Sequence, residues 1–194
     1  MIARLLATCR QLRMVATGLF TAVVVTVPWV TSPPVTVGLL AAGTLLVLAG
    51  LGLRAWAAGH LTKMSSLTTS GPFAYVRNPL YQGSLLAAAG LCLASQWAWS
   101  AALLPVVYLV FYLPTVFHEE GLLRRTFGGD YERYAAAVPR FRPRLRPSPE
   151  CARRGFQWQL LRSNREHRTA VTTLLPLALL WLRLLAPGGL GAIG

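Results

Sequence analysis

The sequence predicts an all-α, polytopic membrane protein with about five transmembrane helices, and three observations indicate this fold class. Of the 194 residues, 54% are hydrophobic and only 13% are charged, whereas a soluble domain of this size carries about 25% charged residues. The apolar residues fall into long runs, several of them close to the roughly 20 residues that cross a bilayer core. Short turns or basic segments separate these runs.

The basic residues are concentrated between the apolar runs. The formal net charge is +13, and 12 of the 19 Lys and Arg residues lie between Arg124 and Arg168. Basic connections are the positive-inside pattern and suit anionic lipid headgroups. We therefore expect contact with anionic lipid and no nucleic-acid partner. The three cysteines lie far apart and match no metal or disulfide framework, so no metal site is expected.

The first two spans are expected at residues 15–30 and 35–53. The arginines before residue 15 resemble the n-region of a signal peptide, but no small-residue cleavage site follows, which favours a retained helix. Thr31-Ser32-Pro33-Pro34 breaks the chain between the two spans. The second span carries no charge and has several glycines, which let helices approach closely.

A helical hairpin is expected to follow a polar connection over residues 54–78. Asn78-Pro79 is typical of an N-cap and a first helical residue, so the third helix is expected over 79–94. Ser95-Gln96 is a short polar break before the fourth span at 97–117. So short a connection predicts two antiparallel neighbours.

The remaining segments are basic and then apolar. Gly128-Gly129 is expected to end the extended fourth helix, with Asp130 capping a short helix over 131–138. The proline-rich strip that follows is expected to be extended, and residues 151–168 to form an interfacial amphipathic helix. Residues 169–186 are a fifth apolar run of marginal spanning length, where Arg183 can snorkel to the interface.

This pattern divides the chain into a membrane domain over residues 1–147 and a basic segment with a further helix over 148–194. The N-terminus and both large polar segments carry the basic residues. We therefore expect a multi-pass protein of the cell (inner) membrane, with the N-terminus and the polar segments on the cytoplasmic face.

Two polar clusters lie at the two ends of the hairpin and are expected to form one site. Helix ends at the same membrane level are neighbours, and ionisable residues at a membrane surface are site candidates. Glu119 and Glu120 are about 100° apart on a helix, so both cannot serve the same pairing face; two adjacent carboxylates suit a cationic ligand. The residues expected to meet are Tyr75, Arg77, Asn78, Tyr81, Glu119 and Glu120.

Each of these residues also has a purely structural interpretation. Arg77 can bind lipid phosphate, and Asn78 can act only as an N-cap. Tyr81 fits an interfacial aromatic belt. Glu120 can pair with Arg124 one helical turn away. Gly50-Leu51-Gly52 suits close helix packing as well as a face where a ligand touches backbone.

The two clusters resemble the integral-membrane methyltransferases that include isoprenylcysteine carboxyl methyltransferase and the phospholipid methyltransferases. The resemblance rests on GPFAYVRNPLYQG and, after the hairpin, EEGLLRRTFGGDYERYAAAVPRFRP. It covers about residues 50–143. Isoprenylcysteine enzymes usually have His where this chain has Asn78, and that departure favours a phospholipid-type or other acceptor.

The resemblance implies S-adenosylmethionine as the methyl donor, bound on the cytoplasmic side. It implies cofactor-binding roles for Arg77, Asn78, Pro79 and Tyr81 in the first motif and for Glu119 and Glu120 in the second, while Gly50 and Gly52 match a Gly-x-Gly of related enzymes. Tyr75 can stack on the donor or face its cation. Arg77 and Glu119 are the residues expected to act at the reacting groups.

We therefore expect methyl transfer to a lipophilic acceptor that carries a carboxylate or an amine. The alternatives are an NADPH-dependent membrane sterol or enone reductase, whose related segment carries an acid where this chain has Ser84, and a non-enzymatic membrane protein on the same scaffold.

Overall fold

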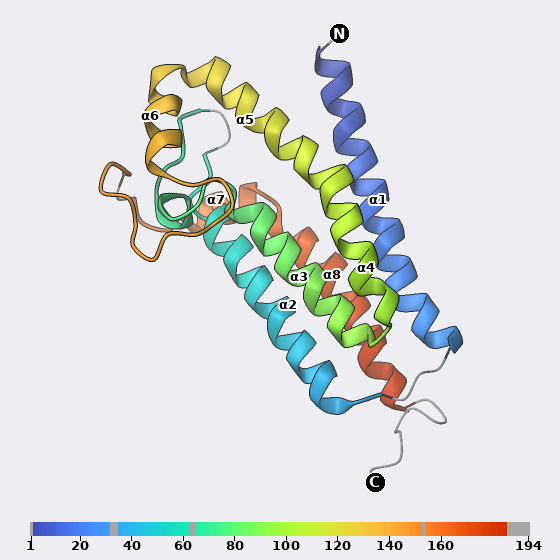
Figure 1. Ribbon diagram of the computed structural model, residues 1–194. Coiled ribbons are helices and arrows are strands. Elements are labelled where there is room, and N and C mark those ends of the chain that lie inside the picture. Colours follow the sequence, from blue (N-terminus) through green and yellow to red (C-terminus); the bar gives the residue numbers. More distant parts are fainter. Residues whose placement is uncertain (1, 32–34, 63–64, 153, 186–194) are drawn as a thin grey trace. The chain divides into compact units, whose positions relative to one another are not determined.

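The computed structural model describes residues 2–31, 35–62, 65–152 and 154–185, with side chains from Arg13 onward. The regular elements of these residues are all helices, and they include no strand. Figure 1 shows the elements in chain order. They are α1 (Ile2–Thr31), α2 (Val37–Ala58), η1 (Gly71–Ala74), α3 (Pro79–Ser95), α4 (Ala98–Val107), η2 (Tyr108–Tyr112), α5 (Leu113–Phe127), α6 (Gly129–Ala137), α7 (Trp158–Ser163), α8 (Glu166–Leu182) and η3 (Arg183–Leu185).

The chain forms two compact units, and four of its helices contribute to both. The first unit comprises Met1–Ala49, Leu85–Thr115 and Ala170–Gly194, and the second comprises Gly50–Ser84 and Val116–Thr169. The boundary therefore falls within α2, α3, α5 and α8.

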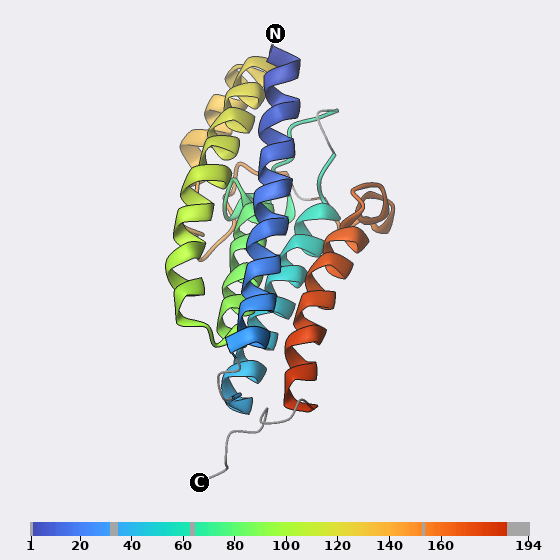
Figure 2. The ribbon, with the colours of Figure 1, turned by 90° about the vertical axis from the view of Figure 1, so that its right-hand side faces the viewer.

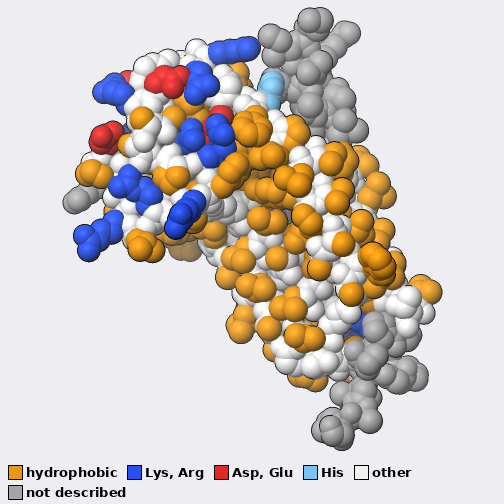
Figure 3. Space-filling view, viewed as in Figure 1, with side chains coloured by type: hydrophobic (Ala, Val, Ile, Leu, Met, Phe, Trp, Pro, Cys, Tyr) orange, Lys and Arg blue, Asp and Glu red, His pale blue; other side chains and the backbone are white. Residues whose placement is uncertain are grey.

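The first unit is an apolar helical bundle. Its helices α1, α4 and α8 and the parts of α2 and α3 that belong to it run side by side (Figures 1 and 2). Hydrophobic side chains cover most of the visible face of this unit (Figure 3), and outward-facing residues such as Leu45 and Leu19 are more than half exposed. Such a surface needs an apolar solvent rather than water.

The lengths of the helices confirm the predicted class of a polytopic, all-α membrane protein. Among the described residues, four helical runs are long and apolar enough to cross a membrane: Arg13–Thr31, Val37–Ala58, Ala98–Phe127 and Glu166–Leu185. The expected third helix also forms, as α3, but has 17 residues. The last of the four runs, Glu166–Leu185, includes nearly all of the fifth apolar run, whose length the sequence analysis found marginal for a span.

Helices α2 and α3 pack closely at two glycines. A Cβ atom built on Gly43 would lie 2.6 Å from the Gly90 carbonyl oxygen and 2.6 Å from the Ala94 amide nitrogen. These are backbone atoms, which cannot rotate away. The small residues noted in the second span therefore serve helix packing here.

Substituting Gly43→Ala is expected to lower the thermal unfolding midpoint of the purified protein. Overpacking a tight contact costs about 1–3 kcal/mol of unfolding free energy, which exceeds the roughly 1 kcal/mol that alanine gains over glycine in a helix. Gly38→Ala is the matched control, because its Cβ would have no atom within 4 Å. Equal midpoints for the two variants, followed by tryptophan fluorescence, would contradict the close approach.

The ends of α2, α3 and α8 are joined by polar contacts inside the first unit. The Gln96 side chain accepts from the Thr36 amide at 2.8 Å and donates to the Thr36 carbonyl at 3.1 Å. Arg183 is only 4% exposed and donates to the Ser95 carbonyl at 3.3 Å. The expectation that Arg183 snorkels outward was therefore wrong, because the last carbonyls of α3 need a donor and the arginine turns inward to supply one.

The run from α4 to α5 contains a wide helical turn between two prolines. At the end of η2 the Leu113 amide bonds to the Tyr108 carbonyl, five residues back. Pro114 follows at once; its ring would clash with the carbonyl four residues earlier in a regular helix. A π-type turn relieves that clash.

The run ends at Phe127 as expected, but the next helix begins one residue before the expected cap. Gly128 has φ +51° and is the N-cap of α6, which starts at Gly129. Asp130 therefore lies in the first turn, where its charge still favours the helix N-terminus. Only glycine adopts this backbone conformation without strain, which explains why the cap is Gly128 rather than Asp130.

The second unit has its own small core under α6. Tyr131, Tyr134 and Val138 are buried, and partly buried residues from α5 and from the 54–78 connection pack against them. Lys and Arg side chains gather on the visible face of this unit (Figure 3). Residues 139–150 form no helix, as expected. The prediction of an amphipathic helix over 151–168 gave the wrong length, because α7 covers only six of these residues.

Candidate functional site

A buried carboxylate, Glu120, is the centre of the polar contacts in the second unit. It is 5% exposed. The Asn78 side-chain amide donates to Glu120 Oε1 at 2.8 Å. On the other oxygen, Arg140 Nε donates to Oε2 at 2.9 Å, and Arg77 Nη1 lies 3.4 Å from it. We call these four residues, Arg77, Asn78, Glu120 and Arg140, the Glu120 cluster.

The local sequence explains why these side chains converge. Arg77 and Asn78 are the last two residues of the 54–78 connection and follow η1. They stand just before Pro79, the first residue of α3. The Arg77 amide donates to the Pro139 carbonyl at 2.9 Å, so the chain after α6 is held against this connection. Because Arg140 follows Pro139, its side chain reaches the same carboxylate.

The Glu120 cluster carries more positive than negative charge. Two guanidinium groups share one carboxylate, and the side chains of Arg77 and Glu120 are only 12% and 7% exposed. A buried carboxylate is tolerated when it is paired and hydrogen-bonded. The excess of one cation leaves the cluster suited to a further anionic group, such as a carboxylate or a phosphate.

Two polar atoms beside the cluster are buried without a hydrogen-bond partner among the described residues. They are Arg77 Nε and the Tyr131 hydroxyl. Burial raises the pKa of Tyr131, and the neighbouring Glu120 carboxylate raises that pKa further. Unpaired buried polar groups are uncommon in folded proteins, and these two atoms retain hydrogen-bonding capacity for a polar group of a ligand.

Aromatic side chains line the connection that leads to α3. Tyr134 donates its hydroxyl to the Phe73 carbonyl at 2.9 Å, and burial raises its pKa well above the ordinary value. The rings of Tyr75 and Trp56 are 6.0 Å apart at centroid and tilted by 57°. These contacts fix the η1 segment, and thereby Arg77 and Asn78, against α6 and α2.

The structure places the residues expected in the first motif close together. Arg77 and Asn78 both contact Glu120. Asn78 is thus more than a helix cap, since its amide nitrogen crosses to another helix. Pro79 and Tyr81 are buried in the first turn of α3.

The adjacent acids Glu119 and Glu120 have different environments. Glu120 points into the cluster, whereas Glu119 is exposed and makes no hydrogen bond or ion pair with a described residue. The suggested pair of Glu120 with Arg124 is absent among the described residues; Arg124 instead pairs with Glu132 at 2.5 Å. The two acids therefore lie on different faces of α5, one exposed and one buried, as their 100° spacing implied.

The two glycines of the Gly-x-Gly pair, Gly50 and Gly52, differ in burial. Gly50 is buried, and a Cβ built on Gly83 would lie 2.7 Å from its carbonyl oxygen. Gly50 thus serves the contact of α2 with α3. Gly52 is exposed, and a Cβ built there would meet nothing within 4 Å. Of these two glycines, Gly52 is the one that offers open backbone surface.

Sequence reasoning missed Arg140 and Tyr131 as members of the site. Both lie within the second matched stretch, in DYERYAAAVPRFRP. Arg140 could have been noticed because it directly follows Pro139. It was instead grouped with Arg142, Arg144 and Arg146 as one of a series of arginines that face lipid.

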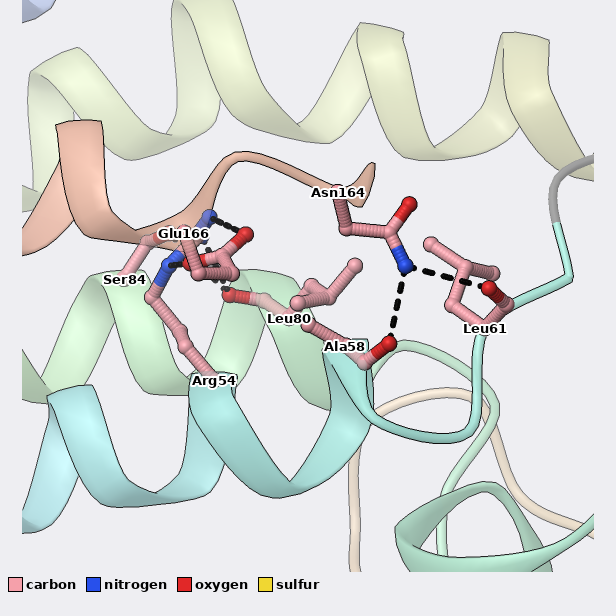
Figure 4. Close-up of polar contacts among 7 residues, drawn as sticks. All are labelled: Arg54, Ala58, Leu61, Leu80, Ser84, Asn164 and Glu166. Carbon is pink, nitrogen blue, oxygen red and sulfur yellow. Dashed lines mark hydrogen bonds and ion pairs between the residues drawn. The ribbon is translucent and has the colours of Figure 1, made fainter. Parts of the chain in front are cut away.

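A second polar cluster ties the chain before α8 to α2 and α3 (Figure 4). Arg54 binds both oxygens of Glu166, at 3.0 and 2.8 Å, and also donates to Ser84 Oγ at 2.5 Å and to the Leu80 carbonyl at 3.1 Å. Asn164 donates to the last carbonyls around the end of α2, those of Ala58 and Leu61, at 2.8 and 3.0 Å. We call Arg54 and Glu166 the Arg54 clamp.

Comparison with known proteins identifies relatives of this chain. It is 31% identical over 119 residues to the nickel-cobalt-cadmium resistance protein NccN of Alcaligenes xylosoxydans xylosoxydans, which is 60% of this chain and 53% of NccN. It is 32% identical over 119 residues to the cobalt-zinc-cadmium resistance protein CzcN of Cupriavidus metallidurans, which is 60% of this chain and 52% of CzcN. The chain thus spans about half the length of these curated relatives. No solved structure matches it.

The family comparison covers the part of the chain that carries both motifs. The sequence model of the phospholipid methyltransferases matches residues 34–130, which is half of the chain and includes Arg77, Asn78, Glu119 and Glu120. The resemblance inferred from the motifs is confirmed. The chain belongs to the phospholipid methyltransferase family.

Proposed function

We propose that this protein transfers a methyl group from S-adenosylmethionine to a lipophilic acceptor in the membrane, and that the acceptor carries an amine or a carboxylate. The observation that carries the proposal is the Glu120 cluster. It joins both family motifs through a buried carboxylate and leaves one cationic charge in excess. Family membership supports the reaction class.

The residues of the site fit the charges of S-adenosylmethionine. Its carboxylate suits the excess positive charge of the cluster, where Arg77 Nε is buried without a described partner. Its ammonium group suits Glu119, which is exposed and makes no hydrogen bond or ion pair with a described residue that would compete. Tyr75, which is partly exposed, offers an aromatic face for the adenine or the cation. Gly52 offers open backbone surface where a ligand can approach.

The reaction needs alignment more than acid–base chemistry. When bound, S-adenosylmethionine supplies a methyl group on a positively charged sulfur, which is a good leaving group. Arg77 and Arg140 would hold a carboxylate in place, and the buried surroundings of Glu120 would exclude water from that side. A carboxylate acceptor needs no base, whereas an amine acceptor must lose a proton to a base.

We further propose that the polar segments face the cytoplasm of a bacterial inner membrane. Both segments and the N-terminus carry the basic residues, and the turns between α1 and α2 and between α3 and α4 carry none. This asymmetry supports the orientation by the positive-inside rule. It would place the donor, a cytosolic metabolite, on the same side as the Glu120 cluster.

Methyl transfer is tested with purified protein reconstituted in bilayer nanodiscs made from total bacterial lipid. After incubation with S-adenosylmethionine labelled in its methyl group, we expect label in the organic extract for the wild type. The Arg77→Met variant should incorporate at least about a hundredfold less, since it loses a charged contact at the reacting groups. The exposed Arg125→Met variant is the matched control. No label above a protein-free disc would contradict the proposal.

A contribution to metal tolerance is a second candidate, and one observation favours it. Both curated relatives are named for resistance to nickel, cobalt, zinc or cadmium. In this candidate the methylated lipid would change how the membrane admits these cations. A host expressing the wild type should then grow at higher cadmium or nickel concentrations than one expressing Arg77→Met. Equal growth of the two strains would remove this candidate and leave methyl transfer untouched.

A further inference from the structure

An exposed loop follows Arg140 and carries an unusual combination of residues. We call residues 141–147 the arginine loop. Leu145 is 100% exposed, and its neighbours Arg144 and Arg146 are exposed too, as are Arg142 and Phe141. A fully exposed leucine gains no burial free energy from its apolar side chain in water, whereas it would gain this free energy among lipid acyl chains. The combination is typical of segments that lie in a membrane interface.

The arginine loop is held in a fixed position. The Arg144 amide donates to the Tyr75 carbonyl at 3.0 Å, and the Ser148 amide donates to the Ala74 carbonyl at 2.9 Å. These backbone bonds attach both ends of the segment around Leu145 to the connection before α3. The exposure of Leu145 therefore belongs to a defined conformation and follows from how the loop is attached.

Two arginines of the loop are unpaired among the described residues. Arg142 and Arg146 make no hydrogen bond or ion pair with the residues that the structure describes. An exposed arginine of α6 differs, since Arg133 pairs with Asp130. The loop thus presents unneutralised guanidinium groups, which suit phosphate oxygens.

The attachment also sets the level of the loop along α3. Tyr75, to which it is bonded, lies four residues before Pro79, where α3 begins. The 17 residues of α3 correspond to about 26 Å of mostly apolar helix, which is close to the thickness of a bilayer core. We therefore expect a segment fixed just before the start of such a helix to lie at the level of the lipid headgroups.

We propose that the arginine loop docks on anionic phospholipid headgroups of the leaflet in which α3 begins, with Leu145 inserted among the upper acyl carbons. Charge complementarity selects the partner, since Arg142 and Arg146 would meet lipid phosphates and the negative surface potential of the leaflet. The same loop follows Arg140 directly, so docking would hold the arginine side of the Glu120 cluster at the membrane surface.

A fluorescent probe at the loop tip tests this directly. The variant Leu145→Cys is made in a chain whose Cys9, Cys92 and Cys151 are replaced by alanine, and is labelled with nitrobenzoxadiazole. Labelled protein is placed in nanodiscs of phosphatidylcholine alone or with 30% phosphatidylglycerol. We expect the anionic lipid to shift the emission to shorter wavelength and to reduce iodide quenching by at least about twofold. High salt should reverse part of the shift.

Matched variants separate the loop from a general effect of charge. Arg142→Gln with Arg146→Gln should abolish the shift, whereas Arg125→Gln with Arg133→Gln removes the same charge from α5 and α6 and should preserve it. Equal emission in both lipids, or equal loss in both double variants, would overturn the proposal. A shift in phosphatidylcholine discs on adding inorganic phosphate or single-stranded RNA would also overturn it. The readout needs no methyl transfer, so it is independent of the proposed function.

Discussion

Replacing Glu120 with glutamine is expected to lower the free energy of unfolding by roughly 3 kcal/mol and to abolish methyl transfer, because breaking a buried ion pair strands its partners. The neutral amide would leave Arg77 and Arg140 without their shared counter-charge, and Arg77 is buried on all but 12% of its side chain. The thermal midpoint in nanodiscs measures the first effect, and label incorporation from S-adenosylmethionine measures the second.

Glu119→Gln is the matched control for this prediction, because it makes the same change one residue earlier. Glu119 is exposed and makes no hydrogen bond or ion pair with a described residue, so the thermal midpoint of Glu119→Gln without ligand should equal that of the wild type. If it holds the donor's ammonium, the KM for S-adenosylmethionine should rise. Equal losses of stability for both variants would contradict the buried placement of Glu120.

Breaking the Arg54 clamp is expected to have the next largest effect. Glu166→Gln should cost roughly 2–3 kcal/mol of unfolding free energy, since it leaves Arg54 partly buried without its bidentate carboxylate. The side chains are 15% and 12% exposed and their charged atoms are 2.8 Å apart. Arg54→Met combined with Glu166→Met should cost much less than the sum of the single changes, because no stranded charge remains.

The clamp makes a further prediction about the chain before α8. Trypsin should cut after Arg162, Arg165 or Arg168 faster in Glu166→Gln than in the wild type, because the clamp anchors the start of α8. The control is Glu132→Gln, which breaks the exposed pair with Arg124 and should change neither the midpoint nor the cleavage rate. Unchanged cleavage in Glu166→Gln would show that α8 is held by its apolar face alone.

The membrane helices could be predicted from sequence because their signal is local. Long apolar runs, proline breaks and the short Ser95-Gln96 turn each act within a few residues, and the observed helices follow them. The end of α5 at Phe127 was also local, since two glycines follow it. The misplaced cap of α6 shows the limit, because composition does not reveal whether Gly128 or Asp130 adopts the capping conformation.

Part of the site could also be predicted from the sequence. Arg77, Asn78 and Glu120 lie at the two ends of the predicted hairpin, and placing these ends at the same membrane level was enough to predict that the three residues meet. Arg140 joins them through a backbone bond between Arg77 and Pro139, a contact across 62 positions that no local pattern indicates. The inward turn of Arg183 was missed likewise, because its partner is the distant carbonyl of Ser95.

The proposed methyl transfer requires that the second unit bind S-adenosylmethionine at the Glu120 cluster. The most direct measurement is equilibrium binding of radiolabelled S-adenosylhomocysteine, the demethylated product, to wild-type protein in nanodiscs. We predict saturable binding with one site per chain, no competition by NADPH, and loss of binding in Arg77→Met but not in the control Arg125→Met. Competition by NADPH would instead favour a reductase. Absence of saturable binding in the folded wild type would contradict the central claim.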